Sequence, residues 1–207
     1  MFKLIKYIIL YIYMNYHGHK LLEEHIVKQN DLKGKIIIEV GSVREYMEGQ
    51  NSTGFFMELC KKHGMKLISV DMDKDCSINV HNEAKKLDFK NYEAITMCGE
   101  DYLKSINTFD YLYLDGFDYY HDYHSQERKD KYKKILNTEI TDKNSWQSHL
   151  EMVQNVYKKS NEYSLICIDD VFNATKGKGC LAIPFLLQNN WKNLENKYNA
   201  SIFSINI

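Results

Sequence analysis

Short apolar runs alternate along the chain with longer stretches whose apolar residues recur at helical spacing. The short runs are rich in Ile, Val, Leu and aromatic residues, which is typical of strands buried inside a sheet. Five such runs occur in order: KIIIEV (35–40), KLISVD (66–71), AITMCG (94–99), FDYLYLDG (109–116) and SLICIDD (164–170). The pattern therefore predicts a sheet whose strands are separated by helices.

Helices are predicted between these strands. Ser52 or Thr53 is expected to cap a helix that ends at Gly64, because small polar residues favour helix starts and glycine favours helix ends. The other predicted helices span 21–30, 78–89, 102–106, 145–159 and 183–188. In the helix 145–159, the apolar stripe is expected to contain Trp146, Leu150, Val153 and Tyr157.

Strands separated by helices form a mainly parallel sheet that is covered by helices on both faces. The tail, residues 191–207, is expected to add an antiparallel hairpin. The sequence thus predicts one doubly wound, Rossmann-like α/β domain over residues 1–207, with a sheet of the seven-stranded type. Residues 1–30 are expected to form an N-terminal extension and a helix.

Two segments interrupt this regular pattern. Residues 117–144 are charged and rich in tyrosine, and they begin without apolar periodicity, which is typical of functional loops and lids. The apolar part of residues 1–14 is too short to cross a bilayer, so no stable membrane span is expected.

Composition narrows the range of partners. The chain has 207 residues and a net charge of −1, which argues against nucleic acid as the main partner because nucleic-acid-binding domains carry basic surfaces. The five cysteines are scattered without a CxxC pair, as expected for reduced thiols in a cytoplasmic protein.

Acidic and small residues follow nearly every predicted strand. In an open parallel sheet, ligands bind just outside the carboxyl ends of the strands, which is where these residues lie. The groups are Glu39-Val40-Gly41-Ser42, Asp71-Met72-Asp73, Cys98-Gly99-Glu100-Asp101, Asp115-Gly116 and Asp169-Asp170. Any one of them could be a cap or a solvated turn, but together they predict a site at one edge of the sheet.

From Lys35 to Gln188, this pattern resembles the class I S-adenosylmethionine (SAM)-dependent methyltransferases. The resemblance rests on EVG after the first strand and on an acid, Asp71, after the second, which in that family grips the ribose hydroxyls. It implies SAM as cofactor, with contacts from Glu39, Gly41, Ser42, Asp71, Met72, Gly99, Glu100 and Asp115. The first loop departs from the family, because Val43 and Glu45 replace expected glycines. A nicotinamide-binding fold would need G-x-G-x-x-G at this point and is disfavoured.

One branch of that family, the catechol, macrocin and cephalosporin-type O-methyltransferases, holds a divalent metal beside the cofactor. By this resemblance, Asp115, Asp169 and Asp170 would bind Mg²⁺, which prefers oxygen ligands. Convergence of the three requires the backbone to leave strand geometry at Asp170. Their mutual repulsion is expected to raise at least one pKa.

Asp118 and His121 are the candidates for the general base, and His121 has an ordinary pKa near working pH. A separate His/Asp metal site in DYYHDYH is less favoured than a loop over the substrate. The pair His17 and His19 is expected on the surface. Lys176-Gly177-Lys178-Gly179 is expected to form a flexible turn before a helix, with contact to an anionic substrate or cofactor group as the alternative.

The sequence therefore predicts a SAM-dependent, Mg²⁺-assisted O-methyltransferase that acts on a hydroxylated small molecule such as a sugar or glycan precursor. The alternative is a Rossmann-like binding protein that has lost methyl transfer. A homo-oligomer is left open.

Overall fold

The computed structural model describes residues 17–43, 51–173 and 176–205, and within them seven strands form one sheet. These strands are β1 (Ile36–Val40), β2 (Lys66–Asp71), β3 (Tyr92–Thr96), β4 (Phe109–Leu114), β5 (Ser160–Ile168), β8 (Lys192–Lys197) and β9 (Ala200–Ser204). Their order across the sheet is β3-β2-β1-β4-β5-β9-β8.

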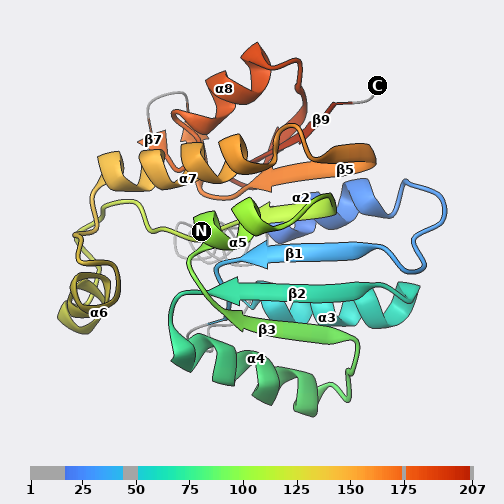
Figure 1. The fold of residues 1–207 in the computed structure, drawn as a ribbon, viewed down its shortest axis with the longest axis horizontal. Helices are drawn as coiled ribbons and strands as arrows, with labels where there is room; N and C mark the ends of the chain where they lie inside the picture. Colours follow the sequence, from blue (N-terminus) through green and yellow to red (C-terminus); the bar gives the residue numbers. More distant parts are fainter. Residues whose placement is uncertain (1–16, 44–50, 174–175, 206–207) are drawn as a thin grey trace, which may run out of the picture.

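The first five strands are parallel, and only β9 runs antiparallel to both of its neighbours. The carboxyl ends of the first five strands, β1 to β5, therefore share one edge of the sheet (Figure 1). This architecture confirms the predicted Rossmann-like domain with a mainly parallel seven-stranded sheet and a C-terminal antiparallel hairpin.

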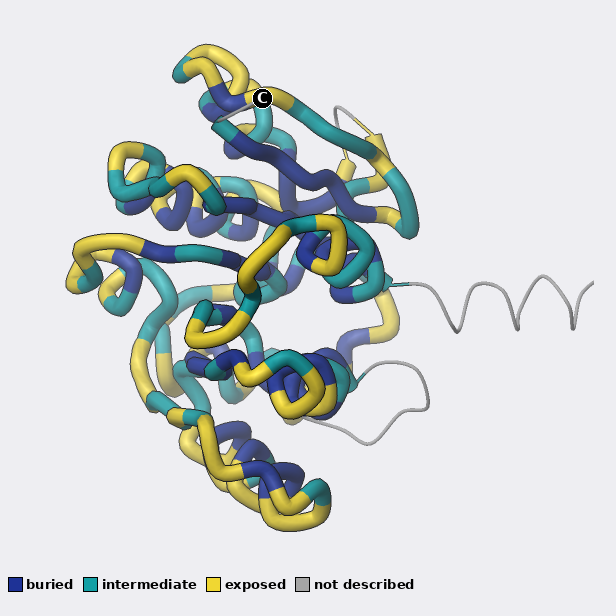
Figure 2. Tube along the Cα trace, turned by 90° about the vertical axis from the view of Figure 1, so that its right-hand side faces the viewer, coloured by how far each residue is buried: buried dark blue, intermediate teal, exposed yellow. Residues whose placement is uncertain are grey.

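Helices cover both faces of the sheet. They are α2 (Gly18–Ile26), α3 (Ser52–His63), α4 (Lys74–Lys86), α5 (Gly99–Ser105), α6 (Gln126–Leu136), α7 (Asp142–Val156) and α8 (Ala182–Gln188). Helices α2, α3 and α4 bury apolar side chains against one face, and α5, α7 and α8 against the other. Figure 2 shows the buried central segments running between exposed outer turns.

Two helices differ in detail from the sequence prediction. Helix α3 is capped by Asn51, whose side chain accepts a hydrogen bond from the backbone of Gly54. On α7, the buried face includes Ser145 and His149 beside the predicted stripe, of which Val153 is buried and Leu150 and Tyr157 are partly buried against the same core. Both side chains are polar, so a pattern of apolar residues does not identify them. Each can be buried because it makes a hydrogen bond.

The segment 117–144 is not irregular throughout, because it contains α6. The Ser125 side chain caps this helix by accepting a hydrogen bond from Arg128 N, at 3.2 Å. Only Tyr132 of α6 is buried, so the helix has no apolar stripe for sequence analysis to detect. In Figure 1, α6 lies beyond the arrowheads of β1 and β2.

A further departure is a two-stranded ribbon after β5, made of β6 (Val171–Asn173) and β7 (Lys176–Gly177). Within the described ranges, no helix has the length and apolar character needed to cross a membrane. The predictions about residues 1–14 and about Glu45 in the first loop concern residues outside those ranges.

Candidate active site

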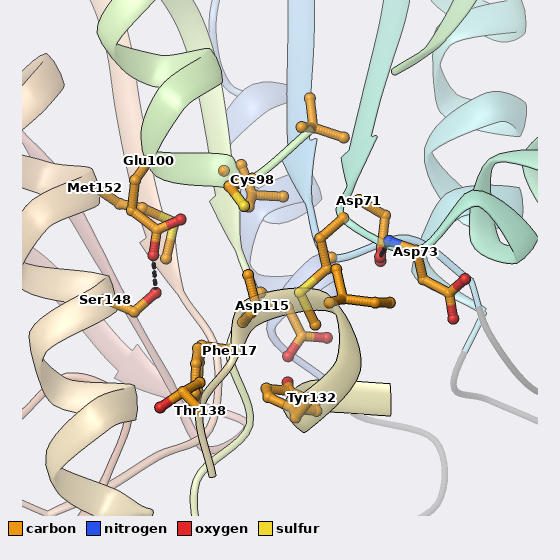
Figure 3. A pocket seen from close by; sticks show the side chains of 18 of the residues that line it. Asp71, Asp73, Cys98, Glu100, Asp115, Phe117, Tyr132, Thr138, Ser148 and Met152 are labelled. Carbon is orange, nitrogen blue, oxygen red and sulfur yellow. Dashed lines mark hydrogen bonds between the residues drawn. The ribbon is translucent and has the colours of Figure 1, made fainter. Parts of the chain in front are cut away.

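A cavity of about 400 Å³ opens at the carboxyl ends of β1, β2 and β4. All the predicted cofactor residues except Glu39 line it: Gly41, Ser42, Asp71, Met72, Gly99, Glu100 and Asp115. In Figure 3, Asp71 and Asp73 lie on one side of this first cavity, and Glu100 and Ser148 lie on the other side. The Ser148 hydroxyl donates a hydrogen bond to the Glu100 carboxylate.

Asp71 ends β2 and holds two loops together. Its Oδ2 accepts a hydrogen bond from Ser42 N at 2.9 Å, and its Oδ1 accepts one from Asp73 N at 2.8 Å. A carboxylate has about four lone-pair sites, so it can accept hydrogen bonds from a ligand as well as from these amides. The amides also fix the orientation of the carboxylate at the cavity wall.

Gly41 brings the end of β1 against the end of β4. Its φ angle is +96°, a conformation that favours glycine, and a Cβ built there would lie 2.4 Å from the Asp115 carbonyl oxygen. The Gly41 amide donates to the Val70 carbonyl at 2.9 Å. The glycine of the EVG motif is therefore required by the packing of the protein's own backbone.

Glu39 lies behind the first cavity and is fully buried. Its carboxylate accepts hydrogen bonds from the hydroxyls of Ser52, Ser69 and Thr53 at 2.5, 2.6 and 2.8 Å. Burial raises the pKa of Glu39 to about 7, against the hydroxyl donors, which lower it. Glu39 thus ties β1 to β2 and to the start of α3, and its role as a cofactor contact stays a prediction.

Replacing Glu39 with glutamine is expected to remove a pH dependence of stability. The folded chain binds this proton more tightly than the unfolded chain, whose pKa is near 4.5. The stabilisation is complete below that value and is lost as the pH rises through about 7. We expect wild-type protein to lose about 1–3 kcal/mol of unfolding free energy across this window relative to Glu39→Gln.

Urea denaturation of both proteins at about pH 5 and about pH 8 measures the effect. Burial lowers the pKa of His19 and of His149 to about 3, so both imidazoles give the opposite slope. They are present in both proteins and cancel in the comparison. Equal slopes for wild type and variant would contradict the assignment.

Helix α6, within the segment 117–144, forms an outer wall of the first cavity, and the role of this segment as a lid over the substrate stays a prediction. Lys131 on α6 binds Asp73 at 2.7 Å and Asp75 at 3.1 Å, which fastens the helix to the end of β2. The Tyr132 ring packs edge-on against Phe117, with 4.8 Å between centroids. The α6 residues follow no strand and fit no motif, so the sequence does not mark them as part of a site.

A second cavity of about 500 Å³ adjoins the first and shares Ser42, Asp115 and Arg128 with it. Its wall is more polar. The other charged, histidine and tyrosine residues on that wall are His17, His19, Tyr113, Asp118, Tyr119, His121, Tyr123, His124, Asp169, Asp170 and Lys178. The predicted metal ligands and both candidate bases therefore line one cavity.

The three acids do not fit the predicted Mg²⁺ site. The Lys178 ammonium lies between Asp115 and Asp170, bonded to Asp115 Oδ1 and 3.0 Å from Asp170 Oδ2. Asp169 instead accepts hydrogen bonds from the Tyr113 hydroxyl and from Gly18 N. Among the described residues, no group of three His, Cys, Asp or Glu side chains could hold a metal ion.

Two predictions about the acids are confirmed. Strand β5 ends at Ile168, and Asp170 has a φ angle of +51°, so the backbone leaves strand geometry there. Burial, followed by the charges of Asp115 and Asp170, raises the pKa of Asp169 to about 8. The repulsion predicted from the sequence is present, although Lys178 offsets part of it.

Lys178 contradicts the prediction of a flexible turn, because its side chain is only 1% exposed. The backbone N–H of Lys178 donates to the Asp170 carbonyl at 3.0 Å. Gly177 permits this approach: its φ angle is +95°, and a Cβ there would lie 1.9 Å from the same oxygen. The glycines of the KGKG stretch were therefore the one feature of the sequence that marked the position of this buried lysine.

Of the histidine pair at the start of α2, His19 is not a surface residue, because it is only 7% exposed, and His17 is half-buried. The His19 ring packs against Phe55, with 4.7 Å between centroids. Among the described residues, His17 Nε2, His19 Nδ1 and His121 Nδ1 are buried atoms without a hydrogen-bond partner. All three side chains line the second cavity.

The two candidate bases are in different environments. Asp118 is bound by the Arg128 guanidinium and anchors the start of α6, while its backbone N–H donates to the Tyr132 hydroxyl at 2.8 Å. His121 stacks on His124, with 3.6 Å between ring centroids. Burial, followed by the neighbouring His124, lowers the pKa of His121, which favours its neutral, proton-accepting form.

No protein-family model and no curated protein sequence matches this chain. Solved structures do match. A candidate methyltransferase from Streptococcus mutans in complex with SAH has a TM-score of 0.56 and 13% identity, over 89% of this chain and 94% of its own. An rRNA methylase from Streptococcus thermophilus has a TM-score of 0.52 and 10% identity, over 89% and 93% of the two chains. At this identity, the likeness shows the methyltransferase fold alone.

Proposed function

We propose that the protein is a SAM-dependent methyltransferase that methylates a hydroxyl group of a small polar molecule. The observation that carries this proposal is the pair of adjoining cavities at the carboxyl edge of the sheet. One presents Asp71 and the loops after β1 and β3, and the other presents imidazoles and charged groups. Ser42, Asp115 and Arg128 line both, which gives the two ligands a common boundary.

The first cavity suits the cofactor. Asp71 would accept hydrogen bonds from the ribose hydroxyls, while Gly99 and Glu100 would border the adenine. The apolar side chains of Val40 and Met152 line the same cavity and offer a surface for a ring system. One matched structure contains SAH, and another is a SAM-dependent methyltransferase from Aquifex aeolicus, which supports the choice of cofactor.

The second cavity suits an acceptor with several hydroxyl groups. Three buried imidazole nitrogens line it without partners among the described residues, and buried polar atoms of this kind gain free energy when a ligand pairs with them. Arg128 and Lys178 add charged donors on its wall. A sugar or glycan precursor has the matching density of donors and acceptors.

Transfer requires a base beside the acceptor hydroxyl. Bound SAM supplies a methyl group: the new C–O bond forms as the S–C bond breaks, and the bonding pair stays on sulfur, leaving neutral SAH. His121 is proposed to take the hydroxyl proton on its unpartnered Nδ1, since its lowered pKa keeps the imidazole neutral near pH 7. Asp118 would position α6 through Arg128.

Two rivals remain as outcomes of the test. A binding protein without transferase activity would take up SAM and never release SAH. RNA is the other rival acceptor, because one matched structure is an rRNA methylase. The net charge of −1 and the polar second cavity favour a small acceptor. The cytoplasmic location and the open question of a homo-oligomer stay predictions.

Calorimetry with SAM, followed by SAH-release assays against panels of polyols and of RNA, tests the proposal. We expect SAM to bind at one site per chain and SAH to form with a hydroxylated small molecule. Binding without turnover in either panel would favour the binding protein, and turnover with RNA alone would replace the proposed acceptor. If SAM does not bind, the proposed function is wrong.

A further inference from the structure

Lys178 lies at the centre of the carboxylates for which the sequence predicts a divalent cation. Its ammonium contacts Asp115 Oδ1 and Asp170 Oδ2 while its side chain is 1% exposed. Lysine is almost never buried this completely unless it is paired, because an isolated buried charge is costly. The two aspartates supply the pairing, and the ammonium in turn offsets their repulsion.

We infer that the Lys178 ammonium is the permanent cation of this site, holding Asp115 and Asp170 together and donating a hydrogen bond to the acceptor oxygen. The site then needs no divalent ion. The first half of this inference stands on the contacts of Lys178 alone. The second half, the contact with an acceptor, rests on the proposed function.

The donors of the ammonium fit this double task. An ammonium group has three N–H donors, and two of them are directed at Asp115 and Asp170. The further contact, with the Asp115 carbonyl oxygen, is long at 3.4 Å. An acceptor oxygen in the second cavity, which Lys178 lines, can replace this weak contact at little cost.

The ammonium also keeps its proton. Burial opposes the charge, but Asp115 and Asp170 outweigh it and raise the pKa of Lys178 well above its ordinary value. Lys178 is therefore a donor and a fixed charge rather than the base, a task left to His121. Its backbone is anchored as well, because the Lys178 amide and Gly177 both pack on the Asp170 carbonyl.

Mn²⁺ binding to the 207-residue chain, followed by the electron paramagnetic resonance of the free ion, tests the inference without any acceptor. Wild type is expected to show no Mn²⁺ site that depends on Asp170. Lys178→Met should remove the ammonium from between the two acids and raise Mn²⁺ affinity by about tenfold or more, because a fixed positive charge no longer repels the ion. Adding Asp170→Asn to this variant should remove the gained site.

Lys176→Met is the matched control, since Lys176 is exposed and lies two positions before Lys178, in β7. It should leave Mn²⁺ binding as in wild type. A Mn²⁺ site in wild type that Asp170→Asn abolishes would overturn the inference, and so would Lys178→Met without any gain. If Lys178→Met does not fold, the comparison of wild type with Asp170→Asn still decides.

The same samples separate this inference from the proposed function. Lys178 does not line the first cavity, whereas its partner Asp115 does, so Lys178→Met should still bind SAM in calorimetry, with a smaller loss of affinity than Asp71→Ala. Absence of SAM binding in wild type would refute the proposed function and leave the Mn²⁺ result intact. A wild-type Mn²⁺ site at Asp170 would refute the role of Lys178 while leaving SAM binding untouched.

Discussion

Asp71→Ala is expected to lower the affinity for SAM by roughly 1.5–3 kcal/mol, which corresponds to about tenfold to a hundredfold or more. The carboxylate is the one charged acceptor at the end of β2 that also receives the amides of Ser42 and Asp73. Its removal takes away the proposed ribose contact and leaves both amides without their acceptor. Calorimetry with SAM measures the loss.

Asp71→Asn divides this effect into its parts. The amide keeps one carbonyl oxygen for the loops but loses the charge and one acceptor, so an intermediate affinity is expected. Asp75→Ala is the control: Asp75 is 71% exposed and lies outside the first cavity, and Asp73 continues to hold Lys131. Unchanged SAM affinity in Asp71→Ala would contradict the assignment of the ribose site.

The sheet and the part of the first cavity formed by strand ends could be predicted because both follow from local patterns. The parallel strands are buried on both faces, so each is a continuous apolar run with a clear end. Their carboxyl ends share one edge, so the residues after the runs identify the cavity wall without any knowledge of packing. Gly41, Asp71 and Glu100 were found in this way.

The rest of the site depends on contacts between residues far apart in sequence. Lys178 can be buried because Asp115, 63 residues earlier, and Asp170 both pair with it. His19 is buried because α2 packs next to α3, and its unpartnered nitrogen lies in a cavity formed by several loops. Neither environment leaves a periodic signal, so composition and spacing favoured exposed surface at both places.

Glu39 shows that a motif can match a family while the direction of its side chain still has to come from the structure. The acid of EVG follows the family pattern, yet its carboxylate faces Ser52, Thr53 and Ser69 behind the cavity. A strand alternates its side chains between faces, so Glu39 and Val40 point to opposite faces of the sheet, and a direct contact of Glu39 with the cofactor stays a prediction. The backbone that follows this acid, at Gly41 and Ser42, is the part that reaches the cavity.

Gly41→Ala is expected to have the largest effect on stability. The new Cβ would lie 2.4 Å from the Asp115 carbonyl oxygen and 3.0 Å from Gly116 N, and both are backbone atoms that cannot rotate away. The ends of β1 and β4 must then separate, which breaks the hydrogen bond from Asp115 N to the Val40 carbonyl. Because both ends line the first cavity, SAM affinity should fall together with stability.

Gly34→Ala separates the clash from the backbone strain. Gly34 also has a left-handed φ angle, +80°, but a Cβ there meets nothing within 4 Å. That variant should lose only the cost of a left-handed alanine, about 1–2 kcal/mol. Gly41→Ala should lose a further 1–3 kcal/mol or so from overpacking, as measured by urea denaturation. Equal losses in the two variants would mean that the ends of β1 and β4 can separate freely, and Gly41 would then have no special role in closing the cofactor cavity.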